Sequence, residues 1–236
     1  LKNADGVLIS GNTIGAFSTS DASLFVQKRG ILLDSTNNAT VTNNYISGHL
    51  EEGISIINDA SGDNINNNKI GTDLSGNYVA GIGNSVGIYF RNGVSTGSFN
   101  NNTVDSNNIA GNQTGIYAQG LVTAGSPSSF SSTGNVINAN NIHDNSGSGI
   151  ILEYFANSDI TNNTISNNGA WGLSDSSTVG ASIGNDIVGN AFSGNVSGGI
   201  RLYANAGGGA SSFVSSNNQI MDNTFNNNGG LAIDLK

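Results

Sequence analysis

The stretch Asn157–Leu173, NSDITNNTISNNGAWGL, contains the pattern that decides the fold. Ile160 is followed three residues later by Asn163, and Asn163 is followed two residues later by Ile165. The same spacing of an apolar residue, an asparagine and a second apolar residue occurs eight times along the chain. The copies are Ile9/Asn12/Ile14, Val41/Asn44/Ile46, Ile65/Asn68/Ile70, Val104/Asn107/Ile109, Ile137/Asn140/Ile142, Ile160/Asn163/Ile165, Ile187/Asn190/Phe192 and Ile220/Asn223/Phe225.

A second pattern, a glycine followed by an aliphatic residue, lies between these copies. Successive glycines of this kind are 23 to 34 residues apart, and the longer intervals contain insertions rich in Gly and Ser. The pairs are Gly30-Ile31, Gly53-Ile54, Gly87-Ile88, Gly115-Ile116, Gly149-Ile150, Gly172-Leu173, Gly199-Ile200 and Gly230-Leu231.

The residues after each of these glycines alternate as in a β-strand. Ile54 and Ile56 are expected to face one way and Ser55 the other, because successive side chains of a strand point to opposite faces. A repeat of about 23 residues with three short strands is typical of one coil of a parallel β-helix. The sequence therefore predicts an all-β fold, a right-handed parallel β-helix of about eight coils in a single domain over 1–236. Each coil buries its apolar side chains only by stacking on its neighbours.

The abundance of asparagine then has a structural explanation. The same turn recurs at every coil of a solenoid, and Gly or Asn suits a turn residue with positive φ. An Asn side chain also hydrogen-bonds the backbone of its own turn and the equivalent Asn one coil away. We expect one ladder of this kind, formed by Asn12, Asn44, Asn68, Asn107, Asn140, Asn163, Asn190 and Asn223.

The Asn-x-Ile and Gly-Ile units resemble the parallel β-helix repeats of bacterial secreted and cell-surface proteins. The stretch 67–90, NNKIGTDLSGNYVAGIGNSVGIYF, is similar to the N-x-I-G-T-D-x-x-G coils of large bacterial surface proteins, and the terminal NNGGLAIDL resembles another of their coil types. The resemblance implies the fold over nearly the whole chain. It implies no single activity, since β-helices occur in lyases, epimerases, hydrolases, adhesins and structural filaments.

The composition excludes several classes of partner. The net charge is −9, from 16 acidic and 7 basic residues, and the basic residues are scattered along the chain. Nucleic-acid binding relies on clustered Lys and Arg, so we expect no nucleic-acid partner. No run of 18 apolar residues is present, so we expect no membrane insertion. The chain has no cysteine and therefore no disulfide framework.

The strand after the repeating glycine is expected to present the most chemically varied outer face. Stacking places its outward residues in two columns. The first column ends with Arg201 and Ala232 in the last two coils. The second column lies two residues further along each strand and begins with Asp34 and Ile57. Tyrosines beside Arg, Gln and Glu suit a carbohydrate, because rings stack on sugar faces and polar groups bond hydroxyls or carboxylates. An exposed sheet face that binds nothing is the alternative, because Tyr favours strands. The candidate carbohydrate-binding residues are Tyr89, Arg91, Tyr117, Gln119, Glu153, Arg201 and Tyr203.

Evidence for catalysis or metal binding is weaker. The chain has three Glu in all, whereas β-helix lyases and hydrolases need clustered carboxylates. Tyr154, Arg91, His143 and Glu153 would supply an epimerase-like set only if they converged. We expect His143 and Asp144 to form a surface hydrogen bond and no metal site. We expect no cofactor, with calcium at 72–77 (TDLSGN without a closing Glu) as the alternative.

These observations favour a structural or adhesive segment of a bacterial extracellular or cell-surface protein that can contact polysaccharide. The alternative is an epimerase or lyase acting on an acidic polysaccharide through the face described above. The sequence begins and ends within repeats, and open strand edges invite pairing. We therefore expect the partners to be other copies of the chain or further coils of a longer one.

Overall fold

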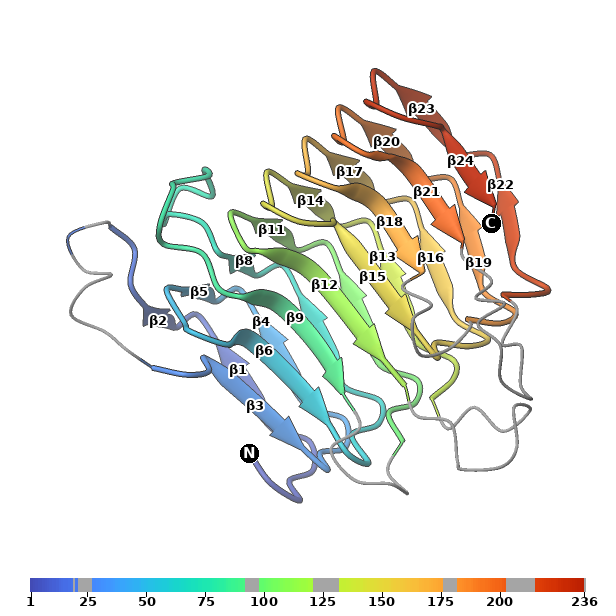
Figure 1. The fold of residues 1–236 in the computed structure, drawn as a ribbon. Coiled ribbons are helices and arrows are strands. Elements are labelled where there is room, and N and C mark those ends of the chain that lie inside the picture. Colours follow the sequence, from blue (N-terminus) through green and yellow to red (C-terminus); the bar gives the residue numbers. More distant parts are fainter. Residues whose placement is uncertain are drawn as a thin grey trace, which may run out of the picture.

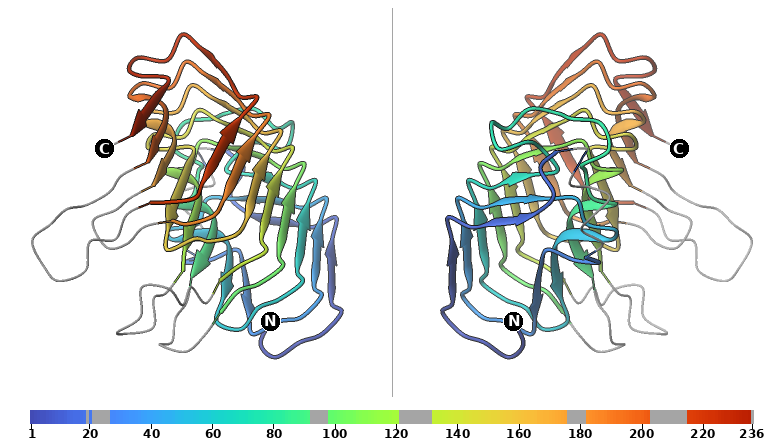
Figure 2. Two further views of the ribbon diagram at one scale, coloured as in Figure 1. Left: turned by 90° about the vertical axis from the view of Figure 1, so that its right-hand side faces the viewer. Right: turned by 90° about the vertical axis from the view of Figure 1, so that its left-hand side faces the viewer.

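The chain folds as a right-handed parallel β-helix, in a computed structural model that describes residues 1–18, 20, 27–91, 98–120, 132–175, 182–202 and 215–235. Each coil contributes one short strand to each of three parallel sheets, and each sheet has eight strands (Figure 1). The coils stack in chain order, and the two termini lie at opposite ends of the stack (Figures 1 and 2). The predicted fold class is confirmed.

The strands are short, mostly of three to six residues. The first sheet contains β1 (Leu8–Ser10), β4 (Thr40–Thr42), β7 (Asn64–Asn66), β10 (Thr103–Asp105), β13 (Val136–Asn138), β16 (Asp159–Thr161), β19 (Asp186–Val188) and β22 (Gln219–Met221). The second contains β2 (Thr13–Gly15), β5 (Tyr45–Ser47), β8 (Lys69–Ile70), β11 (Asn108–Ala110), β14 (Asn141–His143), β17 (Thr164–Ser166), β20 (Ala191–Ser193) and β23 (Thr224–Asn226). The third contains β3 (Ile31–Asp34), β6 (Glu52–Ile57), β9 (Val86–Arg91), β12 (Thr114–Gln119), β15 (Ile150–Glu153), β18 (Trp171–Asp175), β21 (Gly198–Leu202) and β24 (Ile233–Leu235).

The core is a set of aliphatic columns inside the coils. The apolar residues that the repeat identifies pair in register, for example Val104 with Ile137 in the first sheet and Ile109 with Ile142 in the second. All four are 0% exposed. The burial of such columns is the main favourable free energy of the fold, because each coil is covered by the next.

The corner between the first and second sheets explains the Asn-Asn pairs of the sequence. The first residue of the pair adopts a positive φ, as at Asn43 (55°) and Asn162 (55°). The second residue points into the stack, where the Asn140 backbone and side-chain N–H groups both donate to Oδ1 of Asn163, at 2.9 and 3.0 Å. All eight asparagines that the repeat marks are joined in this way: Asn12, Asn44, Asn68, Asn107, Asn140, Asn163, Asn190 and Asn223.

The other two corners carry stacks that the sequence analysis did not foresee. Between the second and third sheets, His49 bonds Asn84, and the stack continues through Asn112, Asn145, Asn168, Asn195 and Asn228. Between the third and first sheets, the stack contains Asp63, Asn102, Asn135, Ser158, Asn185 and Asn218. These side chains satisfy buried backbone groups at every turn, which an apolar corner would leave unpaired.

The repeating glycines allow close stacking, and they explain an error in the predicted register of the last coil. A Cβ added at Gly115 would lie 2.5 Å from the carbonyl oxygen of Gly149 in the next coil. In β24 the residue that pairs with Ile200 is Ile233, so Ala232, and not Gly230, takes the glycine position. No further coil of this chain lies over residue 232, so a methyl group fits there. The first outward column therefore ends at Asp234 and not at Ala232.

In the described part of the chain, no helix is both long and apolar enough to cross a membrane.

Candidate functional site

The outer face of the third sheet brings five of the predicted residues together. Tyr89 pairs in register with Tyr117, and Arg91 pairs with Gln119. Gln119 pairs in turn with Glu153. The five residues therefore lie on three neighbouring strands, β9, β12 and β15, on the side that points away from the core.

Hydrogen bonds connect these side chains. The Tyr89 and Tyr117 rings are stacked, with centroids 4.9 Å apart and an interplanar angle of 21°. The Tyr89 hydroxyl donates to Oε1 of Gln119 at 2.7 Å. Oε2 of Glu153 accepts from the Tyr117 hydroxyl at 2.6 Å and from Nε2 of Gln119 at 2.9 Å. Glu153 is only 4% exposed, so it serves to hold the tyrosine pair in place.

The electrostatics keep both phenols protonated. Burial raises the pKa of Tyr117, and the hydrogen bond to Glu153 and the charge of that residue raise it further. Burial also raises the pKa of Tyr89, although the positive charge of Arg91 opposes this. Near neutral pH the two tyrosines are hydrogen-bond donors with an aromatic surface, and they are not bases.

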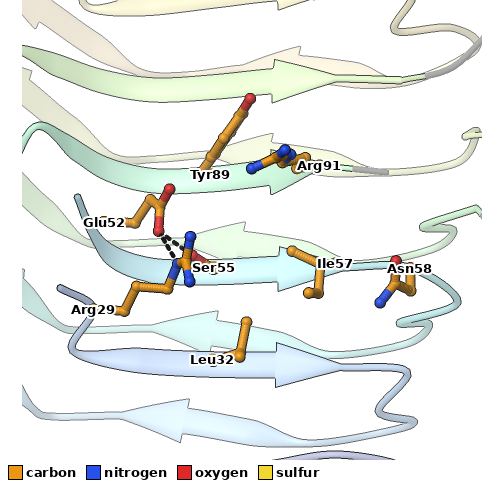
Figure 3. Close-up of a pocket in the computed structure, with 8 residues that line it drawn as sticks. All are labelled: Arg29, Leu32, Glu52, Ser55, Ile57, Asn58, Tyr89 and Arg91. Carbon is orange, nitrogen blue, oxygen red and sulfur yellow. Dashed lines mark hydrogen bonds and ion pairs between the residues drawn. The ribbon is translucent and has the colours of Figure 1, made fainter. Parts of the chain in front are cut away.

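A pocket of about 270 Å³ lies directly beside Tyr89 (Figure 3). Arg29 lines it and is paired with Glu52 through Nε (Figure 3) and with Glu51 at 2.7 Å. The hydroxyl of Ser55 also donates to Glu52, at 2.9 Å. The lining combines charged, aromatic and aliphatic side chains: Arg29, Leu32, Glu52, Ser55, Ile57, Asn58, Tyr89 and Arg91.

Arg91 is the exposed cation of this pocket. It stands at the end of β9, and among the ion pairs of the described residues none involves its guanidinium. Arg29, in contrast, is neutralised by two carboxylates. Positive charge available to a ligand therefore lies at Arg91, next to the Tyr89 ring.

The candidate residues chosen from the sequence did not include Arg29, Glu52, Ser55 and Asn58. Arg29 and Glu52 occupy the position immediately before a repeating glycine, in 29–30 and 52–53. In the structure the Glu52 carboxylate lies on the outer face with Ser55 and Arg29, whereas strict β-strand alternation would point residue 52 inward with Ile54 and Ile56, so alternation does not find this position. Asn58 has a positive φ of 60° beyond the strand, which alternation does not predict.

A second group of side chains lies further along the same face. The guanidinium carbon of Arg201 is 5.2 Å from the centroid of the Trp171 ring, and its NH2 nitrogen donates to the Ser174 hydroxyl at 3.1 Å. Asp234 lies opposite Arg201 in register and is 7% exposed. Tyr203, predicted beside Arg201, lies outside the described residues.

The histidines are in other parts of the molecule. His143, on the second sheet, bonds Asp144 through Nδ1 at 2.7 Å and Asn108 through Nε2 at 2.9 Å. His143 therefore does not join Arg91 and Glu153, which are on the third sheet. Over the described ranges, no three His, Cys, Asp or Glu side chains form a group able to hold a metal ion.

The segment 72–77, considered above for calcium, forms a turn closed by its own side chains. The backbone and side-chain N–H groups of Asn77 donate to the two carboxylate oxygens of Asp73, at 2.8 and 3.2 Å. These bonds lower the pKa of Asp73, the backbone bond most strongly.

Comparison with known proteins identifies one family and several solved structures of the same fold. The family described as periplasmic copper-binding protein (NosD) matches residues 1–128 and 123–234. No curated protein matches the chain in sequence.

Three solved structures illustrate the likeness. The A-module of the Azotobacter vinelandii mannuronan C-5 epimerase AlgE6 is 15% identical with a TM-score of 0.61, over 98% of this chain and 58% of that one. A single-residue mutant of the periplasmic alginate epimerase AlgG is 16% identical with a TM-score of 0.60, over 87% of this chain and 47% of that one. The Dettilon tailspike protein is 19% identical with a TM-score of 0.58, over 97% and 47%. The chain thus spans about half the length of these structures, and the likeness concerns the fold.

Proposed function

This chain belongs to the NosD family, and on that premise we propose that it is a carbohydrate-binding β-helix that holds an anionic polysaccharide on the outer face of its third sheet without turnover. The role is structural or adhesive.

One observation carries the proposal: the exposed guanidinium of Arg91 lies beside the stacked pair Tyr89 and Tyr117. An aromatic surface next to an available cation suits a sugar ring that carries a carboxylate. The hydrogen bonds that the tyrosine hydroxyls donate to Gln119 and Glu153 hold the rings in one orientation before any ligand arrives, which lowers the entropy cost of binding.

Binding without turnover is proposed because none of the following candidate bases, all of them described residues, is free to act at Arg91. An epimerase or lyase must remove a proton from carbon, but the raised pKa values of Tyr89 and Tyr117 keep both phenols protonated. Glu153 is buried and accepts two hydrogen bonds, and Glu52 is paired with Arg29. His143 lies on the second sheet. None of these groups is free to act on a ligand at Arg91.

The copper in the family description does not fit the donor set of this chain. Copper sites use thiolate, thioether and imidazole ligands, whereas the sequence has no cysteine, one methionine and two histidines. His49 follows β5 and His143 ends β14, strands that are three coils apart and so about 14 Å from one another. Met221 lies on the first sheet. These residues cannot share one ion, and no role is assigned to copper.

A location outside the cytoplasm is part of the proposal. The family and the structurally similar alginate epimerase AlgG are both described as periplasmic. An extracellular or cell-surface position would bring the face into contact with polysaccharide.

The test is a binding experiment with two anionic polymers, alginate and polygalacturonate, and neutral dextran. We expect the chain to bind an anionic polymer more tightly than dextran. The affinity for the anionic polymer should fall as the salt concentration rises. Arg91→Gln should weaken binding about tenfold, equivalent to about 1.4 kcal/mol. Lys69→Gln, an equal charge change on the second sheet, is the matched control and should have no effect.

Two results would contradict the proposal. Equal binding to dextran would remove the preference for an anionic ligand on which the role of Arg91 depends, and no binding to any polymer would remove the carbohydrate role. New unsaturated ends or altered uronate stereochemistry would favour the enzymatic alternative, an epimerase or lyase.

A further inference from the structure

We propose that Trp171 and Arg201 form a second contact point for the same anionic polysaccharide, so that the protein binds long chains in preference to short ones. This inference rests on the proposed function of the face at Arg91. It adds a second set of residues and a dependence on polymer length.

The two contact points lie on one surface and in one line. Arg201 pairs in register with Ser174, Ser174 with Ile151, and Ile151 with Tyr117. Tyr117 pairs with Tyr89, which begins the first contact point. Arg201 therefore belongs to the same outward column as the tyrosine pair.

The local structure at Trp171 is specific to this part of the helix. The position before the repeating glycine holds Val86 in β9 and Thr114 in β12, but in β18 it holds Trp171. In the next coil the residue in register is Gly198, with φ of 154°. A Cβ there would lie 2.3 Å from Cζ3 of the Trp171 ring, so only glycine leaves room for the indole.

The side chains at this point match those at the first. Each combines a half-buried aromatic ring with a guanidinium, Tyr89 with Arg91 and Trp171 with Arg201. Asp234, in register with Arg201, lowers the positive charge here. We therefore expect the Trp171 ring and hydrogen bonds from Arg201 to sugar hydroxyls to contribute more than long-range attraction.

Among the described residues, the column between the two points holds no charge that would repel an anionic chain. The column there contains Tyr117, Ile151 and Ser174, with no charged residue among them. The nearby carboxylate of Glu153 is only 4% exposed and is hydrogen-bonded to Tyr117 and Gln119.

The spacing gives the length that a ligand needs. β9 and β21 are four strands apart in the sheet, or about 19 Å at about 4.8 Å per strand. One sugar of an extended chain covers a distance close to one strand spacing, so about four to five sugars reach from Arg91 to Arg201. A polymer that occupies both points binds the second in an intramolecular step, which raises its affinity without new contacts.

The test uses uronate oligomers of increasing length, from dimer to octamer, and the intact polymer, with binding measured by calorimetry. Arg201→Gln retains a hydrogen-bonding group toward Ser174, and Trp171→Thr introduces the residue that β12 has at the same repeat position. We expect each variant to bind the octamer about tenfold more weakly and the dimer as the wild type does.

Thermal unfolding of each variant checks that the fold is retained, and Arg201→Lys serves as a second variant if Arg201→Gln is unstable. Arg201→Lys should lose octamer affinity in the same way, because an ammonium cannot reproduce the guanidinium bonds.

The outcomes separate this inference from the proposal on which it rests. If the wild-type protein binds no anionic polymer, the proposed function itself fails. If it binds polymers through Arg91 but the Trp171 and Arg201 variants bind the octamer normally, the second contact point is wrong. Equal affinity for dimer and octamer would also overturn it.

Discussion

At the scale of single residues, Asp175 stands out because it is a carboxylate in an apolar column. It pairs in register with Leu152 and is 0% exposed. Its partners are the Ser182 backbone N–H and hydroxyl and the Ser215 hydroxyl. Burial raises the pKa of the Asp175 carboxyl to about 6, although these hydrogen bonds oppose the shift. Compared with the unfolded chain, the folded protein thus favours the protonated form of the Asp175 carboxyl.

The raised pKa predicts the sign of a pH effect on stability. In the folded chain Asp175 keeps its proton up to about pH 6, whereas in the unfolded chain it loses the proton near pH 3.8. Its contribution to the free energy of unfolding is therefore complete below pH 3.8 and is lost as the pH rises to 6, by about 3 kcal/mol. Asp175→Asn should remove this loss, so the variant gains stability relative to wild type between pH 4 and 7.

Urea unfolding across this pH range checks the prediction, with the difference between variant and wild type as the readout. Asp159→Asn, on the exposed side of β16, is the control and should follow the wild-type pH dependence. If the free energies of unfolding of Asp175→Asn and wild type changed in parallel with pH, the folded state would not perturb the pKa of this carboxyl.

At the scale of elements, the strands were predictable and the corners only in part. Strand positions follow from periodic spacing, because a buried column requires the same residue type at the same place in every coil. The stack containing Asn140 has an asparagine in all eight coils and could be recognised. The stack through Asp63 and Ser158 changes residue type from coil to coil, because any short polar side chain can accept from the next backbone N–H. Spacing alone does not reveal such a stack.

The same reasoning applies to the candidate site. Tyr89, Arg91, Tyr117, Gln119 and Glu153 follow from strand alternation, and the structure brings them together on one face. The ion pair of Arg29 with Glu52 depends on how two long side chains reach across neighbouring coils. That reach is set by the stacking of coils 23 residues apart in the sequence, and a repeat pattern does not contain it.

A single asparagine of a corner stack is expected to contribute strongly to stability. Asn140 is 1% exposed, and its side chain bonds Asn107, Asn163 and the carbonyl oxygen of Val104. Asn140→Ala would leave several buried backbone and side-chain groups unpaired, which costs about 1–3 kcal/mol for each. We expect a total loss of about 3–5 kcal/mol in the free energy of unfolding.

Chemical denaturation measures this loss, and the neighbouring residue provides the control. Asn141 begins β14 with an exposed side chain, so Asn141→Ala should change stability by less than about 0.5 kcal/mol. Similar losses of unfolding free energy for the two substitutions would mean that an asparagine in the stack contributes no more to stability than a surface asparagine does.

At the scale of the whole molecule, the third-sheet strand of the last coil differs from those of the central coils. Inward residues of the central coils such as Ile116 and Ile150 are 0% exposed, whereas Ile233 and Leu235 of β24 are 38% and 69% exposed. The edge strands of the last coil also present unpaired backbone groups, which favour pairing with another chain. Either further coils of a longer polypeptide or a second copy can cover such an edge.

For the chain of 236 residues, we predict head-to-tail association that increases with protein concentration. All strands of one sheet run parallel in register, so the last coil of one copy can pair with the first coil of the next. Leu235→Lys should weaken this association, because stacking would bury its ammonium group without a partner. Folding should be unaffected, since Leu235 is already exposed. Sedimentation equilibrium measures the effect, with Leu74→Lys as the control, at a 49% exposed position between β8 and β9 of the third coil. A wild-type protein that stays monomeric at high concentration, or that associates as strongly with Lys at 235, would show that this edge does not drive self-association.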